Sequence, residues 1–281
     1  MNDPIFKLTY FSLGHILSII VPIFLIVMLF FLLRNASTRT QKAVILTIML
    51  INVFQHVFKA WVWYPMYHGK FDPGMSFFAN ICGSVILLSP FIFLGKNDVL
   101  KDGLFLLGNL CAIVSTWFIT ITYGISFLHI EYIRYFTAHC LLMITSSLPV
   151  LLGLHTVNVR NFWAIGLFYI ALETIVFLDN FVNTAAKVSW DWAKAYATIY
   201  KANKLFIMKA SGPEVFDHTF LAGTKIKYVI DDGTITYVPV LWSAPAIWLG
   251  LSVISWVVFK ICTKLHIDGY YLGYSYEKVR F

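Results

Sequence analysis

A cysteine and a histidine in apolar surroundings could together carry out nucleophilic chemistry. Cys82 lies within the apolar residues 75–94, and His139 lies within the apolar residues 131–154. The thiolate is the reactive form of cysteine, and a histidine within hydrogen-bonding reach can take the thiol proton. In a membrane this pair suits acyl transfer through a thioester, because acyl chains can reach the site laterally from lipid.

Both residues also have a structural interpretation. A buried cysteine often serves only as a small apolar side chain. A histidine in a membrane helix often only hydrogen-bonds a neighbouring helix. The depths of other ionisable residues favour a site instead. At 1.5 Å per residue, His56, Cys82, His139 and Glu173 lie roughly 10–13 Å from the outer ends of four apolar stretches. Ionisable side chains at such depth indicate a functional site.

From this layer we predict a catalytic set and a substrate-binding set. A third group should orient the imidazole, and Glu173 and Asn80 are the candidates. The catalytic set is Cys82, His139 and Glu173, and the substrate-binding set is His56, Asn80, Tyr169, Arg134 and Asn180. Tyr169, Glu173 and Asn180 lie on one face of a helix by their spacing.

We expect no cofactor and no metal. The four cysteines form no CxxC pair, so the sequence indicates neither a zinc site nor a disulfide framework. The layer holds the right ligand types for zinc, but no local ligand motif supports one.

The elements that position these residues are membrane helices. The chain of 281 residues is 59% hydrophobic and only 12% charged, whereas a soluble domain carries about 25% charge. We predict an all-α, polytopic bundle of about seven transmembrane helices. Their approximate ranges are 13–33, 43–64, 75–94, 103–125, 131–154, 161–182 and 240–261. Each range is near the 20 or so apolar residues that a bilayer requires.

A long polar segment interrupts the bundle. We divide the chain into helices one to six at 1–185, an extracellular insertion at 186–238, and helix seven with a cytoplasmic tail at 239–281. Residues 190–209 have the pattern of an interfacial amphipathic helix. Asp232 and Gly233 between alternating stretches predict a β-hairpin. This insertion could cover the outer mouth of the bundle or bind an extracellular partner; the alternative is an ordinary loop.

Loop charges predict the orientation. The loops after the first, third and fifth ranges hold Arg34, Arg39, Lys42, Lys96, Lys101 and Arg160. Short loops rich in lysine and arginine stay in the cytoplasm. We therefore expect a multi-pass protein of the cytoplasmic membrane with its N-terminus outside and its C-terminus inside. The net charge of +7 is explained by these loops and calls for no nucleic-acid partner.

Two stretches carry a family resemblance. Residues 134–139 (RYFTAH) resemble the signature of the YwaF-like bacterial integral membrane proteins, with an arginine and a phenylalanine ahead of a histidine. Residues 77–84 (FFANICGS) resemble the cysteine stretch of that family. Its eukaryotic relatives are similar to ether-phospholipid acyltransferases. The resemblance implies that Cys82 is a nucleophile, that His139 is its base, and that a membrane phospholipid is the partner.

The sequence thus favours a phospholipid acyltransferase or acyl hydrolase that works through a thioester. A proton-coupled transporter of small molecules or lipids is the first alternative, because intramembrane His, Glu and Lys residues also form proton relays. A lipid-binding membrane protein without catalysis is the second alternative.

Overall fold

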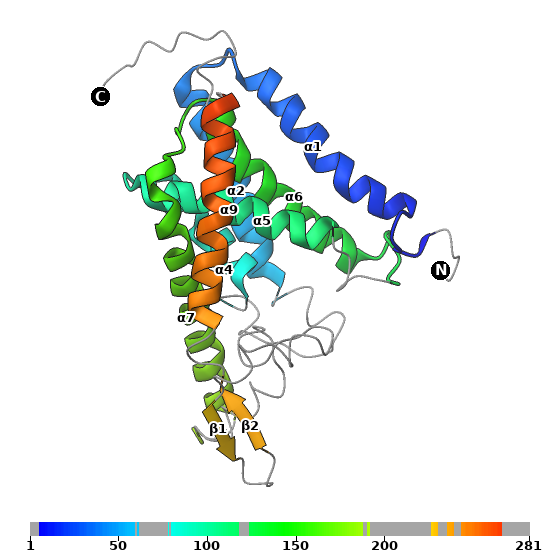
Figure 1. Cartoon of the computed structure of the whole chain (residues 1–281). Helices are drawn as coiled ribbons and strands as arrows, with labels where there is room; N and C mark the ends of the chain where they lie inside the picture. The colour runs from blue at the N-terminus through cyan, green and yellow to red at the C-terminus, as the bar shows by residue number, and fades with distance from the viewer. Residues whose placement is uncertain are drawn as a thin grey trace.

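A computed structural model of the chain describes residues 6–59, 61, 78, 80–117, 124–187, 190–191, 226–229, 235–238 and 243–265. Within these residues, seven α-helices and one 3-10 helix are present (Figure 1). They are α1 (Leu13–Leu33), α2 (Thr38–Phe58), α4 (Ile81–Leu94), α5 (Asp98–Trp117), α6 (Ile130–Leu151), η5 (Val159–Asn161), α7 (Phe162–Lys187) and α9 (Ser243–Leu265).

Capping side chains decide where several helices begin. Ser12, Ser37 and Asn80 each accept a hydrogen bond from a backbone N–H in the first turn of α1, α2 and α4. Such caps satisfy N–H groups that have no partner inside the helix. As a result α2 begins at Thr38 rather than near residue 43, and α4 begins at Ile81 rather than near residue 75.

Helix α6 lies inside the bundle. It packs against α1, α2 and α5, while α5 also packs against α4 and α7, and α9 lies along α7. Leu142 and Leu148 of α6 are fully buried. Gly108 of α5 allows Ser146 of α6 to approach closely, because a Cβ there would overlap the serine side chain. The polar residues of α6 therefore face other helices.

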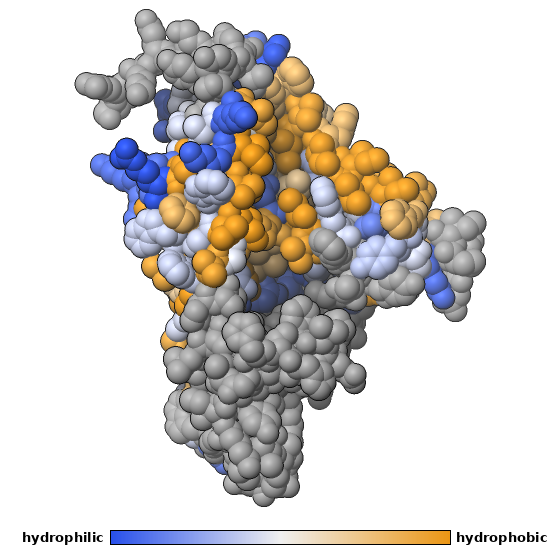
Figure 2. Space-filling view, in the orientation of Figure 1, coloured by the Kyte–Doolittle hydropathy of each residue, from blue (hydrophilic) through white to orange (hydrophobic). Residues whose placement is uncertain are grey.

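The surface of the bundle is that of a membrane protein. Five segments are long and apolar enough to cross a bilayer: α1, α2, α5, the stretch Val159–Asn183 that includes most of α7, and Trp248–Leu265 of α9. Figure 2 shows apolar side chains along the whole of α1, where Phe24 and Leu32 are 61% and 67% exposed. This confirms a helical membrane protein. Helix α4 has only 14 residues and α6 is not among the five, so their crossing of the membrane stays a prediction.

The N-terminal segment is tied to the start of α6. The Leu8 N–H donates to the carbonyl of Ile125, and the Phe127 N–H donates to the carbonyl of Phe6, at 2.8 and 2.9 Å. Leu8 is fully buried beside Tyr132. These two parts of the chain therefore lie at one end of the bundle.

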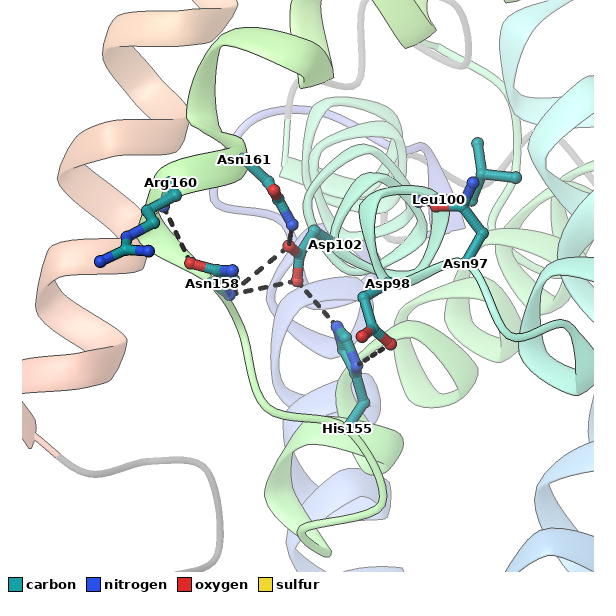
Figure 3. A network of polar contacts seen from close by, with 8 residues as sticks. All are labelled: Asn97, Asp98, Leu100, Asp102, His155, Asn158, Arg160 and Asn161. Carbon is teal, nitrogen blue, oxygen red and sulfur yellow. Dashed lines mark hydrogen bonds and ion pairs between the residues drawn. The ribbon is translucent and has the colours of Figure 1, made fainter.

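A buried polar network joins the chain at the other end (Figure 3). Asp102, in the first turns of α5, is fully buried. One carboxylate oxygen lies 2.7 Å from Nε2 of His155, and the other accepts a hydrogen bond of 2.7 Å from the Asn161 side chain. The Asn158 N–H also points at this carboxylate. The network fixes the link between α6 and α7 to the beginning of α5.

Two short strands follow α7 in the chain. Strand β1 (Ile226–Val229) pairs antiparallel with β2 (Ile235–Val238), with Ile226 opposite Val238. The turn residues Asp232 and Gly233, and residues 192–225 with most of the predicted amphipathic helix, lie outside the described residues. The insertion as a unit, its cover over the bundle and its division from the bundle at residue 186 therefore stay predictions. Helix α7 itself continues to Lys187.

Candidate functional site

Cys82 lies in the first turn of α4. The Asn80 side-chain oxygen accepts a hydrogen bond of 2.8 Å from the Gly83 N–H and so starts the helix just before Cys82. The expectation of a cysteine about 10 Å inside a longer helix was therefore wrong, because the Asn80 cap shortens that helix. The N-terminal end of a helix carries partial positive charge, which favours a thiolate there.

Three side chains from two other helices surround the thiol. His139 of α6 and Cys111 and Ser115 of α5 lie close enough to Cys82 to interact with its thiol. The Ser115 hydroxyl oxygen is 4.0 Å from Sγ of Cys82. His139 thus lies beside Cys82, and the catalytic role of the pair stays a prediction. All four cysteines of the chain are free thiols.

The other nitrogen of His139 fixes its tautomer. Nδ1 lies 2.8 Å from the backbone carbonyl oxygen of Tyr135, one turn earlier on α6. A carbonyl can only accept, so Nδ1 carries the proton and Nε2 is left as an acceptor. The Tyr135 ring also packs on the imidazole, with centroids 4.3 Å apart. The imidazole is therefore oriented by a backbone carbonyl, and not by Glu173 or Asn80 as the sequence suggested.

His56 of α2 lies directly against the first turn of α4. A Cβ built on Gly83 would be 2.5 Å from Cε1 and 2.9 Å from Nε2 of His56. Asn52, one turn earlier on α2, donates a hydrogen bond of 2.9 Å to the carbonyl of Ala138. This bond holds α2 beside α6 at the level of His139, and His56 is thereby placed next to the cysteine.

The acidic member of the predicted set is held within α7. The Tyr169 hydroxyl donates a hydrogen bond of 2.6 Å to Glu173, whose side chain is only 7% exposed. Tyr169 is close enough to Cys111 and Cys82 to interact electrostatically with them. Among the described residues, no hydrogen bond joins Glu173 to His139. Its role in the chemistry stays a prediction.

Two cations lie at the edge of the cluster. Lys59, just after α2, is close enough to interact electrostatically with Arg134 of α6 and with Cys82. Both side chains are half-buried. The site can therefore attract an anionic or strongly polar group next to the thiol. The side chain of Asn180, which the sequence placed in the substrate-binding set, lies outside the described residues.

Sequence reasoning missed three residues that the structure places in the cluster. Cys111 and Ser115 lie one turn apart on α5, and Tyr135 lies one turn before His139. The Tyr135 hydroxyl lies close enough to Ser115 to interact with it. Spacing of four residues on one helix was the available signal. Within the described part of the chain, no three His, Cys, Asp or Glu side chains are grouped so as to hold a metal ion.

The fold and the cluster define a multi-helix membrane protein with a cysteine and a histidine between its helices. The chain belongs to the TMEM164 family, whose model matches residues 10–242. The match includes every helix of the cluster and ends just before α9. Searches of curated proteins and of solved structures returned no match to the chain. The family match supports a membrane protein but does not confirm the narrower YwaF-like or acyltransferase resemblance.

Proposed function

We propose that the chain is a membrane-bound acyltransferase that carries an acyl group of a phospholipid on Cys82 as a thioester. The observation that supports this most is the meeting of the Cys82 thiol with a histidine whose Nδ1 is already engaged by the Tyr135 carbonyl. Nε2 is then the nitrogen available to receive the thiol proton. Helix dipole and imidazolium together stabilise the resulting thiolate.

The proposed reaction has two halves. The Cys82 proton moves to Nε2 of His139, and Sγ attacks the carbonyl carbon of an ester in the donor phospholipid. The ester C–O bond breaks, and the departing lysolipid oxygen takes the proton back from His139. The acceptor hydroxyl then gives its proton to Nε2, its oxygen attacks the thioester carbonyl, and the C–S bond breaks. Sγ leaves as a thiolate and recovers the proton. Water as the acceptor makes the same reaction a hydrolysis.

Neighbouring side chains have defined tasks in this scheme. The Ser115 hydroxyl, 4.0 Å from Sγ, can donate to the oxyanion that forms at the attacked carbonyl. Lys59 and Arg134 can hold the phosphate of the lipid, because both lie close to one another beside the cysteine. His56 lies against the first turn of α4, and Tyr169, which is bonded to Glu173, lies close enough to Cys82 and Cys111 to interact with them.

The test uses purified full-length protein and a phospholipid with an alkyne-tagged acyl chain. We expect a covalent adduct on Cys82 that neutral hydroxylamine removes, as it removes a thioester. Cys82→Ala should abolish the adduct, and Cys82→Ser should form it poorly. Cys262→Ala is the matched control, because this buried thiol lies on α9 away from the cluster. A full adduct in Cys82→Ala would show the proposed nucleophile to be wrong.

His139→Gln tests the base. Glutamine can keep a hydrogen bond but cannot take a proton, so we expect the rate of adduct formation to fall by about 10²–10⁴-fold. Binding of the intact lipid should change little. If His139→Gln forms the adduct at the wild-type rate, another group removes the proton.

The Cys82→Ala variant also separates catalysis from transport, when the movement of lipid or protons is measured instead of the adduct. A proton relay would use ionisable side chains such as His139 and Glu173, the latter buried inside the bundle, and would have no need for a thiol. A protein that moves lipid or protons equally well with Cys82→Ala would therefore be a transporter.

A further inference from the structure

A polar cavity lies at the opposite end of the bundle from Cys82. It has a volume of about 260 Å³ and lies between the end of α4, the start of α5 and the second half of α6. Its lining includes Lys42, Lys96 and Lys101. Ser146, which also lines it, is seven residues beyond His139 on α6, about 10 Å along the helix. The cavity is therefore separate from the cysteine cluster.

The described part of the chain does not neutralise the positive charge of this cavity. Among the described residues, no carboxylate forms an ion pair with any of the three lysines. The nearby acidic groups, Asp98 and Asp102, both face the two ring nitrogens of His155, at 3.9 and 2.7 Å. These contacts direct His155 to its carboxylate partners, and the lysines are left to attract an anion.

The Ser146 hydroxyl belongs to a residue that lines the cavity but packs on Gly108 of α5. Oγ of Ser146 is buried and has no hydrogen-bond partner in the structure, and the residue is 1% exposed. An unpaired buried hydroxyl is costly. Phosphate oxygens accept hydrogen bonds from ammonium groups, so one phosphate could bind several of the lysines together.

Apolar residues beside the lysines indicate that the anion comes from a lipid. Leu94, at the end of α4, lines the cavity and is 63% exposed, and Phe91 one turn earlier is 75% exposed. Pockets that enclose a whole drug-sized ligand measure about 300–1,000 Å³, so this cavity is of a size for a headgroup only. The acyl chains would then lie outside, along the apolar side of α4.

We propose that this cavity binds the phosphate of an anionic glycerophospholipid, with Lys42, Lys96 and Lys101 as the headgroup site. The site is independent of the proposed acyl transfer at Cys82. By the loop charges it lies in the cytoplasmic leaflet, where anionic lipids are enriched.

The test measures lipid adducts on the full-length protein by native mass spectrometry in a neutral detergent. Delipidated protein is titrated with phosphatidylglycerol and, separately, with phosphatidylcholine. We expect one tightly bound phosphatidylglycerol on the wild type. Lys96→Gln with Lys101→Gln should weaken this binding about 20–30-fold, from the usual contribution of a lysine near an anionic headgroup. Ser146→Ala should leave this binding unchanged, because the serine hydroxyl packs on Gly108.

The matched control removes two lysines near the end of α9, which ends on the same side of the bundle as the cavity. Lys260→Gln with Lys264→Gln on α9 lowers the net charge equally but should change phosphatidylglycerol binding less than about twofold. Equal losses in both double variants would mean general charge attraction and would overturn the site. Displacement of the lipid by millimolar inorganic phosphate or glycerophosphate would overturn the assignment of a lipid as the ligand. It would indicate a soluble phosphate ligand instead. Equal binding of phosphatidylcholine to the same lysines would overturn the selectivity for an anionic lipid.

Discussion

The contact between His56 and Gly83 determines how closely α2 approaches the cysteine. Because Gly83 has no side chain, the imidazole lies where a Cβ would be, 2.5 Å from Cε1. Gly83→Ala should push the buried imidazole away and destabilise the protein by about 1–3 kcal/mol, as overpacking usually does. It should also slow adduct formation at Cys82. Thermal unfolding and the acyl probe measure the two effects.

Gly250→Ala is the matched control for this change. A Cβ on Gly250 of α9 meets nothing within 4 Å. Alanine favours a helix over glycine by about 1 kcal/mol, so this variant should unfold at the wild-type temperature or slightly above it. If Gly83→Ala and Gly250→Ala behave alike, His56 does not rest on the first turn of α4.

At this scale the sequence identified the unusual residues but not their partners. Cys82, His56, His139 and Glu173 attract notice because ionisable or nucleophilic groups are uncommon in apolar stretches. Cys111, Ser115 and Tyr135 are ordinary residues for a membrane helix, and only the packing of α5 against α6 brings them to the thiol. Which face of a helix meets which neighbour depends on three-dimensional packing, and hydropathy alone does not contain it.

The buried Asp102 connects two elements, the start of α5 and the link between α6 and α7. Asp102→Ala would leave His155 and the Asn161 amide without their partner, which lies 2.7 Å from each. Removal of one member of a buried charged pair is strongly destabilising. We expect a loss of about 3 kcal/mol, measured as a lower midpoint of thermal unfolding.

Asp98→Ala provides the comparison for Asp102→Ala. Asp98 also faces His155, but at 3.9 Å and with its side chain 70% exposed. Exposed pairs contribute about 0–1 kcal/mol, so the midpoint should move little. A similar loss in both variants would mean that the Asp102 network does not hold the two elements together.

The helices themselves were predictable because each apolar stretch of sufficient length becomes one. The bounds of the helices were less predictable. Hydropathy averages over many residues, whereas a single capping residue decides where a helix begins. Asn97 illustrates this, because its side chain accepts the Leu100 N–H at 3.2 Å and starts α5 five residues before the predicted position. The same effect at Asn80 moved Cys82 from the middle of a helix to its first turn.

At the scale of the whole molecule, the N-terminal pairing restricts how the chain crosses the membrane. Residues 6–8 bond to residues 124–127, so both lie on one side. An even number of crossings must separate them. Helices α1, α2 and α5 supply three, and we infer that the short α4 supplies the fourth.

The same reasoning applies to α6. It begins beside the N-terminal segment, and the chain after it bonds through His155 to Asp102 at the opposite end of α5. Helix α6 packs along α5 between these points. We infer that α6 crosses the membrane antiparallel to α5, although it is not among the five segments that length and composition single out as membrane spans.

These inferences predict the sides of three introduced cysteines. Asp98→Cys lies at the first residue of α5, Leu128→Cys lies before α6, and Lys225→Cys lies after α7. With the N-terminus outside, an impermeant maleimide applied to intact cells should label positions 128 and 225 but label position 98 only after lysis. The wild-type protein measures the background, which should be low because its four cysteines are buried or half-buried.

Labelling of position 98 alone would keep the number of crossings but reverse the orientation, placing Cys82 in the cytoplasmic half of the membrane. Labelling of 98 and 128 from the same side would show that α5 does not cross, and the count of crossings that requires α4 and α6 in the membrane would be wrong.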